Sequence, residues 1–472
     1  MKMWSGRFRQ PLDPDFERWQ RSFSFDRRLL RYELAASSAH ARALKDAGVL
    51  SSEELISILQ GLQQIGEQAD ASPSFLNDDE AEDVHHFVEK QLVALIGETG
   101  YKLHSGRSRN EQIAADLRLY VRTAIDQLRH ELAELCAVLG DRAEQAGDTA
   151  MPAYTHLQRA EPVLASHWLL AYVEMFLRDA ERLADCRKRL NVSPLGSGAV
   201  AGATLPLDRA FMAETLGFDG FTANSIDATS DRDFAMEFVG ALSILATHLS
   251  RWAEEMILFS SQEYGFLGLP EAYSTGSSAM PQKKNPDLLE LVRGKSSRVL
   301  GNAVALMVAV KGLPLAYNKD LQETQEQLFD SSDTLLQMLP LVAGWMKAVD
   351  FHFERMQQAA QSGFMNAWAA ATYLVKRGVP SRLAHERIGK AVQMCIERGC
   401  KLKDLPLDDL QSLSPAFGQD FYESVQLLSV LAIHDVPGGT APVRVRQAIS
   451  STRKKIDLLR EEVRTQETHA HA

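Results

Sequence analysis

The stretch from Glu111 to Gly140 carries an apolar side chain at every third or fourth position, and this regularity constrains the fold more than any other feature. Such a repeat places its apolar side chains along one face of an α-helix that packs lengthwise on other helices. The sequence therefore predicts a long helix within a bundle. The apolar positions are Ile113, Leu117, Val121, Ala124, Leu128, Leu132, Leu135 and Leu139.

Three further segments, residues 234–260, 288–310 and 335–349, show the same periodicity and predict long helices of the same bundle. Helices with more than one apolar side are typical of bundles that also associate with further copies of the chain. The alternation of apolar and polar residues that indicates β-strands is nearly absent. The predicted fold class is therefore all-α, with a long central helix bundle.

The chain is expected to divide into three parts. The long helices define a central domain, residues 111–362, which follows an N-terminal domain, residues 1–110. After Gly363 the helical patterns become short and several prolines interrupt them. This change favours a small C-terminal helical domain, residues 363–472.

Charge and hydropathy exclude several classes of protein. The net charge is -11 and the basic residues are scattered, whereas nucleic-acid-binding proteins cluster them in a patch. No apolar run reaches the roughly 18 to 20 residues of a membrane span. The first residues also lack the apolar stretch of a secretory signal. We therefore expect a cytoplasmic protein that binds neither nucleic acid nor membrane.

The most unusual connection is GSSAMPQKKNPD, residues 276–287, between a helix that ends near Ser261 and one that begins after Pro286. The whole segment has roughly 20 residues, more than the two to eight usual between packed helices, and long loops tend to carry function. Its serines can transfer protons, its adjacent lysines can bind a carboxylate, and its asparagine can add a hydrogen bond. The composition indicates an anion-binding catalytic loop. The alternative is an ordinary helix connection in which Ser277 only caps a turn.

The extended stretch GSSAMPQKKNPDLLELVRGK closely resembles the signature of the fumarase/aspartase superfamily. Its double-lysine form PQKKNPD is similar to that of the argininosuccinate lyases within this superfamily. Further stretches match in the same order along nearly the whole chain, which makes the resemblance specific. They are WSGRF (4–8), EDVHHFVE (82–89), HSGRSRNEQ (104–112), YTHLQRAEP (154–162), SPLGSGAVAGATLPLDR (193–209), NSIDATSDRDF (224–234), LPLAYNKDLQE (313–323) and PGGTAP (437–442).

The resemblance implies an assembly and a reaction. The assembly is a homotetramer in which long helices of four subunits form a twenty-helix core and each active site is built from three subunits. The reaction is the reversible β-elimination of argininosuccinate to L-arginine and fumarate, a step of arginine biosynthesis, with neither a metal nor an organic cofactor.

The resemblance also assigns roles in the reaction. Elimination needs a base for the proton beside a carboxylate and positive charge for the aci-carboxylate that forms. Ser277 matches the catalytic base, Lys283 the group that stabilises the carbanion, and Asn285 a residue that binds a substrate oxygen. His156 matches a second catalytic position, either as the general acid or as a positioning group. Glu290 is expected to orient His156 across a subunit boundary.

A third set of residues is expected to bind the substrate. Residues 108–110 precede a long helix, where the helix dipole and an arginine both favour a carboxylate. His85 matches a histidine close to the substrate, and two residues beside His156 repeat the family pattern. The full set is Ser22, Asp26, His85, Ser108, Arg109, Asn110, Thr155, Gln158, Asn285, Tyr317 and Gln322, of which Ser22, Asp26, Tyr317 and Gln322 match positions that bind the arginine half.

Neither a metal site nor a nucleotide site is predicted. His85 and Glu89 lie one helical turn apart, a spacing compatible with metal ligation, but the sequence shows no third ligand. The glycines of LGSGAVAG follow the spacing GxGxxxG, whereas dinucleotide-binding loops follow GxGxxG.

The chain departs from the family pattern at three positions, and two rival functions remain. Ser105 and Glu111 are conservative replacements, whereas Gln325 stands where many relatives carry a lysine that reaches a substrate carboxylate. The first rival is a superfamily enzyme for adenylosuccinate, fumarate and malate, or aspartate, although such enzymes typically have a single lysine in this motif. The second rival is a structural protein without activity, as the crystallin relatives are. An assay distinguishes all three.

Overall fold

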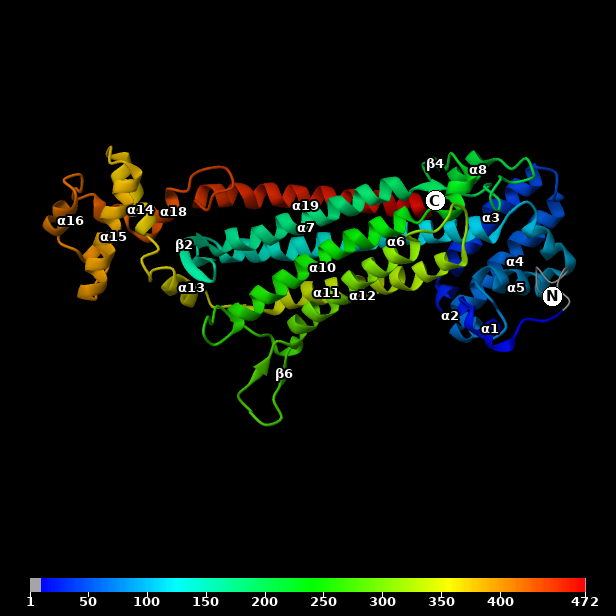
Figure 1. Cartoon of the computed structure of the whole chain (residues 1–472), viewed down its shortest axis with the longest axis horizontal. Helices are drawn as coiled ribbons and strands as arrows, with labels where there is room; N and C mark the ends of the chain where they lie inside the picture. Colours follow the sequence, from blue (N-terminus) through cyan, green and yellow to red (C-terminus); the bar gives the residue numbers. More distant parts are fainter. Residues whose placement is uncertain (1–9, 472) are drawn as a thin grey trace.

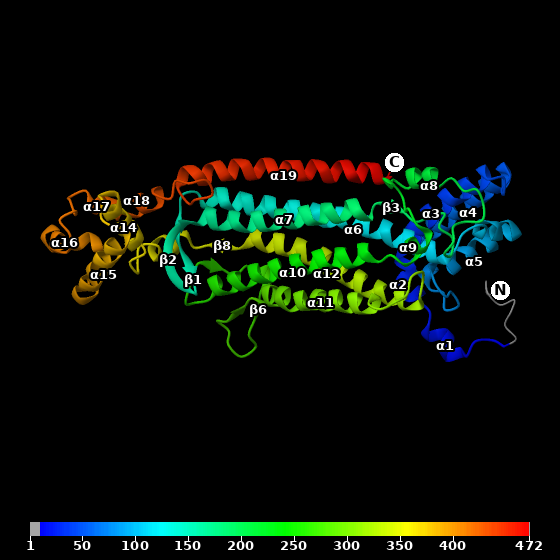
Figure 2. The ribbon, with the colours of Figure 1, turned by 45° about the horizontal axis from the view of Figure 1, so that its top comes forward.

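The computed structural model describes residues 10–471, and their side chains as far as residue 466. The predicted motif WSGRF lies outside this range. Within it the chain is an elongated molecule built almost entirely of helices (Figures 1 and 2), which confirms the all-α fold class. None of the helices described is long and apolar enough to cross a membrane.

Five long helices form the central bundle, and a sixth, α19, packs along two of them. The longest, α6, contacts α7, α12 and α19, while α10 packs against α11. The bundle helices are α6 (Arg109–Ala146), α7 (Ala165–Leu190), α10 (Asp233–Ser260), α11 (Asp287–Val310) and α12 (Thr324–Ala348), with α19 (Pro442–His471) alongside.

The local sequence explains where α6 begins and ends. Ser108 caps its first turn, and the side chain of Glu111 accepts a hydrogen bond from the backbone N–H of Ser108, which completes a capping box. Between these ends, the predicted apolar stripe is buried along the whole helix. The helix stops before Gly147, whose φ of 54° is left-handed and favours glycine. At 38 residues α6 is about 57 Å long.

Three of the four predicted long helices agree with the structure to within a few residues, and the fourth is too short. The prediction began that helix at Leu335, whereas α12 begins at Thr324. Its first turns, TQEQLFDSSD, are mainly polar and show a weak apolar period. The helix also continues through Pro340, a residue that normally ends or kinks a helix.

The N-terminal helices pack around one end of the bundle, where α3 contacts α6 (Figure 1). Two short helices, α8 and α9, join this end, and the parallel pair β3–β4 packs against α8. The elements here are α1 (Pro14–Trp19), α2 (Phe23–Asp26), η2 (Arg27–Leu29), α3 (Leu30–Asp46), α4 (Ser52–Ala71), η3 (Pro73–Leu76), α5 (Val84–Ile96), η4 (Gly97–His104), β3 (Val192–Ser193), α8 (Arg209–Thr215), β4 (Gly220–Phe221), α9 (Ser225–Ser230) and η6 (Lys319–Glu323).

Short helices at the opposite end of the bundle form a separate unit. Leu374, Phe417 and Phe421 belong to an apolar core of their own there, distinct from the core of the bundle. The chain then returns to the bundle as α19. The elements of this end are α13 (Phe353–Ala359), α14 (Ala367–Lys376), α15 (Ser381–Arg398), η7 (Leu402–Asp404), α16 (Leu407–Leu413), α17 (Phe421–Ser424) and α18 (Leu427–Ala432).

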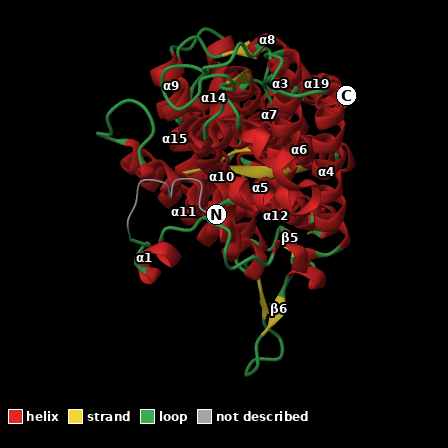
Figure 3. Cartoon of the chain, turned by 90° about the vertical axis from the view of Figure 1, so that its right-hand side faces the viewer, coloured by secondary structure: helices red, strands yellow, loops and turns green. Residues whose placement is uncertain are grey.

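Small antiparallel pairs extend from the bundle. The hairpin of β1 (Ala150–Thr155) and β2 (Gln158–Leu164) follows the end of α6. A second hairpin, β6 (Thr275–Gly276) with β7 (Lys284–Asn285), projects from the side of the bundle between α10 and α11, as Figure 3 shows most clearly. The predicted loop between these helices is therefore present. Beside its base, β5 (Leu267–Gly268) pairs with β8 (Asp350–Phe351), and η5 spans Glu271–Tyr273.

Candidate active site

Seven of the predicted substrate-binding residues line one cavity of about 140 Å³ at the N-terminal end of the bundle. They come from α2, α5, the first turn of α6, and the segment from Tyr317 through η6. The lining residues are Ser22, Asp26, Glu82, Asp83, His85, Arg109, Asn110, Ile113, Tyr317, Lys319, Gln322 and Gln325. We call this cavity the N-terminal pocket. Sequence analysis quoted the motifs that contain Glu82, Asp83 and Lys319 but did not assign those residues a role.

Asp26 is the most deeply buried acid of the pocket lining. Its carboxylate accepts hydrogen bonds from the Ser22 hydroxyl at 2.6 Å and from the Val84 backbone N–H at 3.1 Å. Burial and the nearby charge of Asp83 raise the pKa of Asp26 to about 7. Asp26 therefore gains or loses its proton near neutral pH, and a bound cation would favour its ionised form.

Arg109 is held by two carboxylates of its own chain. One guanidinium nitrogen lies 2.9 Å from Asp83 and 3.2 Å from Glu82. Burial alone would raise the pKa of Asp83, but the charges of Arg109 and His85 keep that pKa below its usual value. Lys319 lies 3.9 Å from Glu82, so both cations lining the pocket already face an acid.

Ser108 and Asn110 form the start of α6. The Ser108 hydroxyl accepts a hydrogen bond from the backbone N–H of Asn110 at 3.3 Å, and it is not among the pocket lining. The Asn110 side chain donates to the carbonyl of Ala199 at 3.5 Å. On the far side, Gln322 donates to the carbonyl of Gln20 at 3.1 Å. Ser108 therefore shapes the backbone of the pocket, while Asn110 and Gln322 line it.

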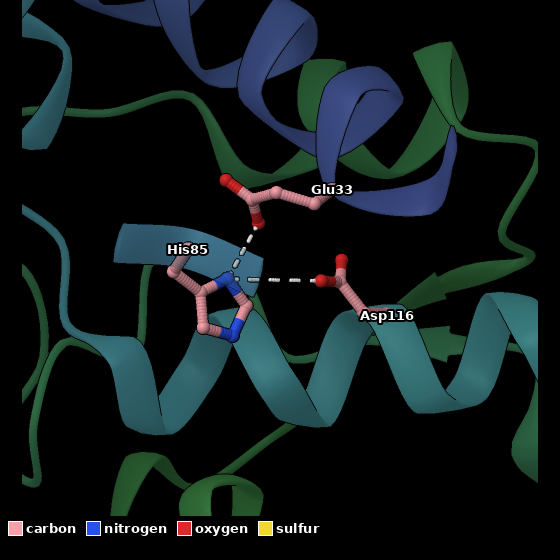
Figure 4. Close-up of side chains that lie close together, drawn as sticks. All are labelled: Glu33, His85 and Asp116. Atoms are coloured by element: carbon pink, nitrogen blue, oxygen red, sulfur yellow. Dashed lines mark hydrogen bonds and ion pairs between the residues drawn. The ribbon is translucent and has the colours of Figure 1, made fainter. Parts of the chain in front are cut away.

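His85 joins a buried cluster of two acids (Figure 4). Its Nδ1 lies 2.9 Å from a Glu33 oxygen and 3.8 Å from an Asp116 oxygen. Sequence analysis missed both acids because each lies inside an ordinary helical stretch, on α3 and α6. Glu89, the residue at metal-binding spacing from His85, is not part of the cluster.

The three side chains of this cluster have ligand atoms within 4.8 Å of one another, a spacing at which such groups can hold a metal ion. Donor groups already surround one oxygen of the Glu33 carboxylate. Glu33 accepts hydrogen bonds from Ser37 at 2.6 Å and from Gln112 at 3.0 Å, and the guanidinium of Arg107 lies 3.6 Å away. These donors fit an ionised carboxylate better than a metal ligand, because a guanidinium beside the ion would repel it.

The predicted catalytic residues of the β6–β7 hairpin lie at the surface. The Ser277 hydroxyl accepts hydrogen bonds from the backbone N–H groups of Ala279 at 3.3 Å and Met280 at 3.1 Å. The Lys283 ammonium donates to the Asn285 side chain at 2.6 Å. Lys284 instead contacts Glu271 at 3.0 Å. The two lysines therefore point to different partners.

Glu290 is exposed on the first turns of α11, and its side chain has no hydrogen-bond partner in the part of the chain that the structure describes. Like the residues of the β6–β7 hairpin, it faces away from the protein.

His156 and Leu157 are the two residues of the β1–β2 turn, with φ of 54° and 56°. Two-residue hairpin turns of this kind need left-handed residues at both positions and usually use glycine or asparagine. Thr155 and Gln158 pair directly across the turn, and all four residues are exposed. A non-glycine residue held in this region is strained, and such strain is frequent at functional sites.

One chain holds the N-terminal pocket far from the Ser277 hairpin and from the His156 turn. The N-terminal pocket includes Asn110 at the start of α6, whereas the His156 turn follows the other end of this helix, about 57 Å away. Glu290 lies in the first turn of α11, whose 24 residues span about 36 Å, and Tyr317 follows the other end of this helix. The structure therefore brings the pocket residues together but places the Ser277 hairpin and the His156 turn elsewhere on the molecule.

Two family models match the sequence. One, described as lyase, covers residues 6–301, and the other, described as argininosuccinate lyase C-terminal, covers residues 364–432. The argininosuccinate lyase of Koribacter versatilis is 60% identical and covers 97% of this chain and 98% of that protein. That of Acidobacterium capsulatum is 57% identical and covers 96% of this chain and 95% of that protein.

Solved structures share the fold. The structure of EDDS lyase in complex with formate has a TM-score of 0.85 and 26% identity, covering 98% of this chain and 94% of that one. A class II fumarase from Schistosoma mansoni has a TM-score of 0.72 and 18% identity, covering 84% of this chain and 89% of that one. The second likeness concerns the fold alone.

Proposed function

Because the chain belongs to the argininosuccinate lyase family, we propose that it catalyses the reversible β-elimination of argininosuccinate to L-arginine and fumarate. The observation that carries the proposal is the identity of 60% over nearly the whole length of a named argininosuccinate lyase. The double-lysine motif of residues 276–287 supports the same substrate. The reaction is a step of arginine biosynthesis, and we place it in the cytoplasm.

The reaction breaks a carbon–nitrogen bond without a redox change. A base takes the proton from the carbon beside a carboxylate, and the aci-carboxylate that forms is stabilised by positive charge. The electron pair then forms the double bond of fumarate, while the nitrogen of arginine leaves with the pair of the C–N bond and takes up a proton. The residues of this chain can supply each of these steps, and no organic cofactor or metal is needed.

Ser277 is the proposed base. A neutral serine hydroxyl is a weak base. Groups that stabilise its oxyanion increase the fraction of the side chain that is ionised and able to take up a proton. The two backbone N–H groups that hydrogen-bond to its oxygen, from Ala279 and Met280, favour the ionised form. The same two hydrogen bonds to the Ser277 oxygen are therefore expected both for a serine that only caps a turn and for one that acts as a base. Lys283, held by Asn285, supplies positive charge for the aci-carboxylate.

His156 is the proposed second catalytic group, with Glu290 as its partner from another subunit. Both side chains are exposed, and helices separate them from the N-terminal pocket within one chain. A carboxylate beside an imidazole orients the ring and favours its charged form. His156 then either protonates the leaving nitrogen or donates a hydrogen bond to a substrate carboxylate.

The N-terminal pocket is the proposed site of the arginine half. Asp26, with Ser22, Tyr317 and Gln322 around it, is suited to an ammonium or guanidinium group. A cation there would favour the ionised form of Asp26, which burial otherwise disfavours. Gln325 also lines this pocket with a neutral side chain, so the lysine and arginine side chains of the lining are those of Lys319 and Arg109.

The site is completed, we propose, in a homotetramer. Five bundle helices from each of four chains give the twenty-helix core that the resemblance implies. An exposed apolar surface on α11 supports association, because large side chains in contact with water favour burial against another copy. It consists of Leu291, Leu300, Val304, Met307 and Val308. Three subunits would then contribute the pocket, the Ser277 hairpin and the His156 turn to each site.

A direct assay tests the proposed reaction. Purified protein is mixed with argininosuccinate and the absorbance of fumarate is followed, with and without prior treatment by a chelator. We expect turnover that chelation does not change, and no comparable turnover of adenylosuccinate. Loss of activity in chelator would show a metal requirement. Equal turnover of adenylosuccinate would favour a different enzyme of the superfamily, and no turnover of either would favour a structural protein.

A further inference from the structure

His85 is held on one side of its ring by buried acids, while its other nitrogen has no partner within the described part of the chain. Nδ1 faces Glu33 and Asp116, and Nε2 lies on the side of the ring turned away from both (Figure 4). Nε2 is buried, and His85 lines the N-terminal pocket. Leaving a buried donor unpaired costs roughly 1–3 kcal/mol. A bound molecule with an acceptor group would remove that cost.

We propose that Glu33 is a positioning residue that holds His85 as an imidazolium, with its Nε2–H directed at an anionic group of the bound substrate. In this arrangement Asp116 is a neutral carboxyl group beside the pair. The proposal rests on the proposed function, because argininosuccinate carries the carboxylates that such a donor would bind. No motif and no family match assigned a role to Glu33 or Asp116.

Hydrogen bonding distinguishes the two acids. Glu33 accepts from Ser37 and Gln112 and has Arg107 at 3.6 Å, so its negative charge is stabilised on several sides. Both oxygens of Asp116 are buried and lack a hydrogen-bond donor. A buried carboxylate without donors is unfavourable, whereas a protonated carboxyl is tolerated. The geometry therefore favours charge on Glu33 and neutrality on Asp116.

The charges around the ring lead to the same assignment. Burial alone would raise the pKa of Glu33, but the charges of His85 and Arg107 lower it to about 2. Burial and the negative charge of Glu33 raise the pKa of Asp116 well above its usual value. Burial lowers the pKa of His85, but the charge and hydrogen bond of Glu33 outweigh it and raise that pKa.

Further groups face His85 from the neighbouring elements. Asp83, at the start of α5, and Asp26, on α2, both raise the pKa of His85. Arg109, a cation of the pocket lining, is paired with Asp83. Glu33 is hydrogen-bonded to the ring at 2.9 Å, and the Gln112 side chain lies 3.5 Å from the same Nδ1. Of these two partners only Glu33 carries a charge, so it determines the charge of His85.

Two isosteric variants form a matched test. Glu33→Gln removes the charge that stabilises the imidazolium, whereas Asp116→Asn replaces one neutral group by another. A histidine whose pKa is raised binds an anion fully below that pKa and loses the contact as the pH rises through it. Glu33→Gln should therefore raise KM about tenfold above neutral pH, because losing one charge-assisted hydrogen bond weakens binding by about this factor. At about pH 6 the increase in KM should be much smaller.

Asp116→Asn should not change the pH at which KM begins to rise, which should be the same as in the unaltered protein. An equal pH shift in both variants, or no shift in Glu33→Gln, would overturn the proposal. Adding Glu33→Gln to a His85→Gln protein should raise KM no further, because the carboxylate acts through the ring. An additional increase there would mean that Glu33 acts by another route.

A spectroscopic measurement on the unaltered protein tests the same point without relying on either acid variant to fold. Solid-state ¹⁵N spectra of histidine-labelled protein, from which the spectrum of His85→Gln is subtracted, report the ring of His85. We expect both ring nitrogens to remain protonated at a pH at which an unperturbed histidine has already become neutral. A neutral ring would refute the proposal. This readout does not depend on turnover, so a charged His85 in a protein without lyase activity would refute only the proposed function.

Discussion

The N-terminal pocket and the β6–β7 hairpin are both rich in polar and charged side chains, but the protein surrounds them differently. In the pocket Asp26, His85 and Arg109 are largely buried, and each has a partner from another segment. On the hairpin Lys283 and Ser277 bond only to residues of the hairpin itself. The pocket is therefore complete within one chain, whereas the hairpin presents its groups to water.

This difference bears on where catalysis can occur. Opposite charges attract far more strongly in a water-excluded site than at the surface, where water and salt screen them. Lys283 at the surface of one chain can contribute little to stabilising an aci-carboxylate. It can contribute several kcal/mol once another subunit covers the hairpin and excludes water. The contrast fits the proposal that one chain supplies a prepared binding pocket and its neighbours supply the catalytic groups.

The largest expected effect is on the hairpin side of this comparison. Ser277→Ala should lower kcat about a thousandfold or more, because it removes the base of the reaction. Ser278→Ala is the matched control, since it alters the adjacent hydroxyl and should be much less damaging. Steady-state kinetics on both variants, with size measurement to confirm assembly, provides the check. Near-normal rates for both would make the hairpin a structural connection.

The adjacent lysines allow a second test of the hairpin. Lys283→Met should cost roughly 3–4 kcal/mol of transition-state stabilisation, whereas an exposed ion pair such as that of Lys284 with Glu271 is worth well under 1 kcal/mol. Rates for Lys283→Met and Lys284→Met, converted to free energies, measure the difference. Equal losses would mean that the catalytic lysine has been assigned wrongly.

Mixing two inactive proteins tests whether the hairpin and the His156 turn of one site come from different chains. Ser277→Ala retains a normal His156, and His156→Asn retains a normal Ser277. In random hybrids of equal amounts, a site whose two residues come from different subunits has both normal in about a quarter of cases. Activity should therefore return to about a quarter of that of the unaltered protein.

The control for this experiment is each inactive protein dissociated and reassociated alone, which should remain inactive. Mass measurement must first show that hybrids have formed. Hybrids that form and stay inactive would mean that a single chain provides both residues, and the shared site would have to be abandoned.

Four of the six long helices in the described part of the chain, α6, α10, α11 and the second part of α12, could be predicted from sequence because their signal is local. The apolar side chains from Ile113 to Leu139 recur with a helical period, and the cap at Ser108 lies directly before them. The β1–β2 hairpin could not be predicted in this way. Its turn uses His156 and Leu157, neither of which favours a left-handed backbone, so no glycine or asparagine marks it.

The candidate site was predictable only where residues belong to a recognisable motif. Matching motifs indicated seven residues that the structure places around one pocket. Glu33 and Asp116 lie on helices far apart in the sequence, and only the packing of α3, α5 and α6 brings them to His85. The roles of Ser277, Lys283, His156 and Glu290 stay predictions, because none of these residues lines the N-terminal pocket of the same chain.

The smallest expected effect concerns Asp26 in the N-terminal pocket, where one substitution should change protein stability and substrate binding in opposite directions. Asp26 has its pKa raised to about 7 by burial and by the charge of Asp83. A carboxyl group whose pKa is higher in the folded than in the unfolded state makes the fold less stable as the pH rises through both values. Asp26→Asn, which resembles the protonated form, should therefore raise the free energy of unfolding above pH 7. It should also weaken substrate binding.

Asp83→Asn is the matched control, because the two acids are neighbours with opposite shifts. The pKa of Asp83 is lowered by Arg109 and His85 despite its burial, so its stabilising effect is present above its unfolded pKa and is lost as the pH falls through its folded pKa. Asp83→Asn should therefore lower the melting temperature at neutral pH, while Asp26→Asn raises it. Calorimetry at about pH 5 and pH 8 should show the gain from Asp26→Asn growing with pH. Changes of the same sign in both variants would contradict the idea that the pocket tolerates a strained Asp26 for the sake of binding a cation.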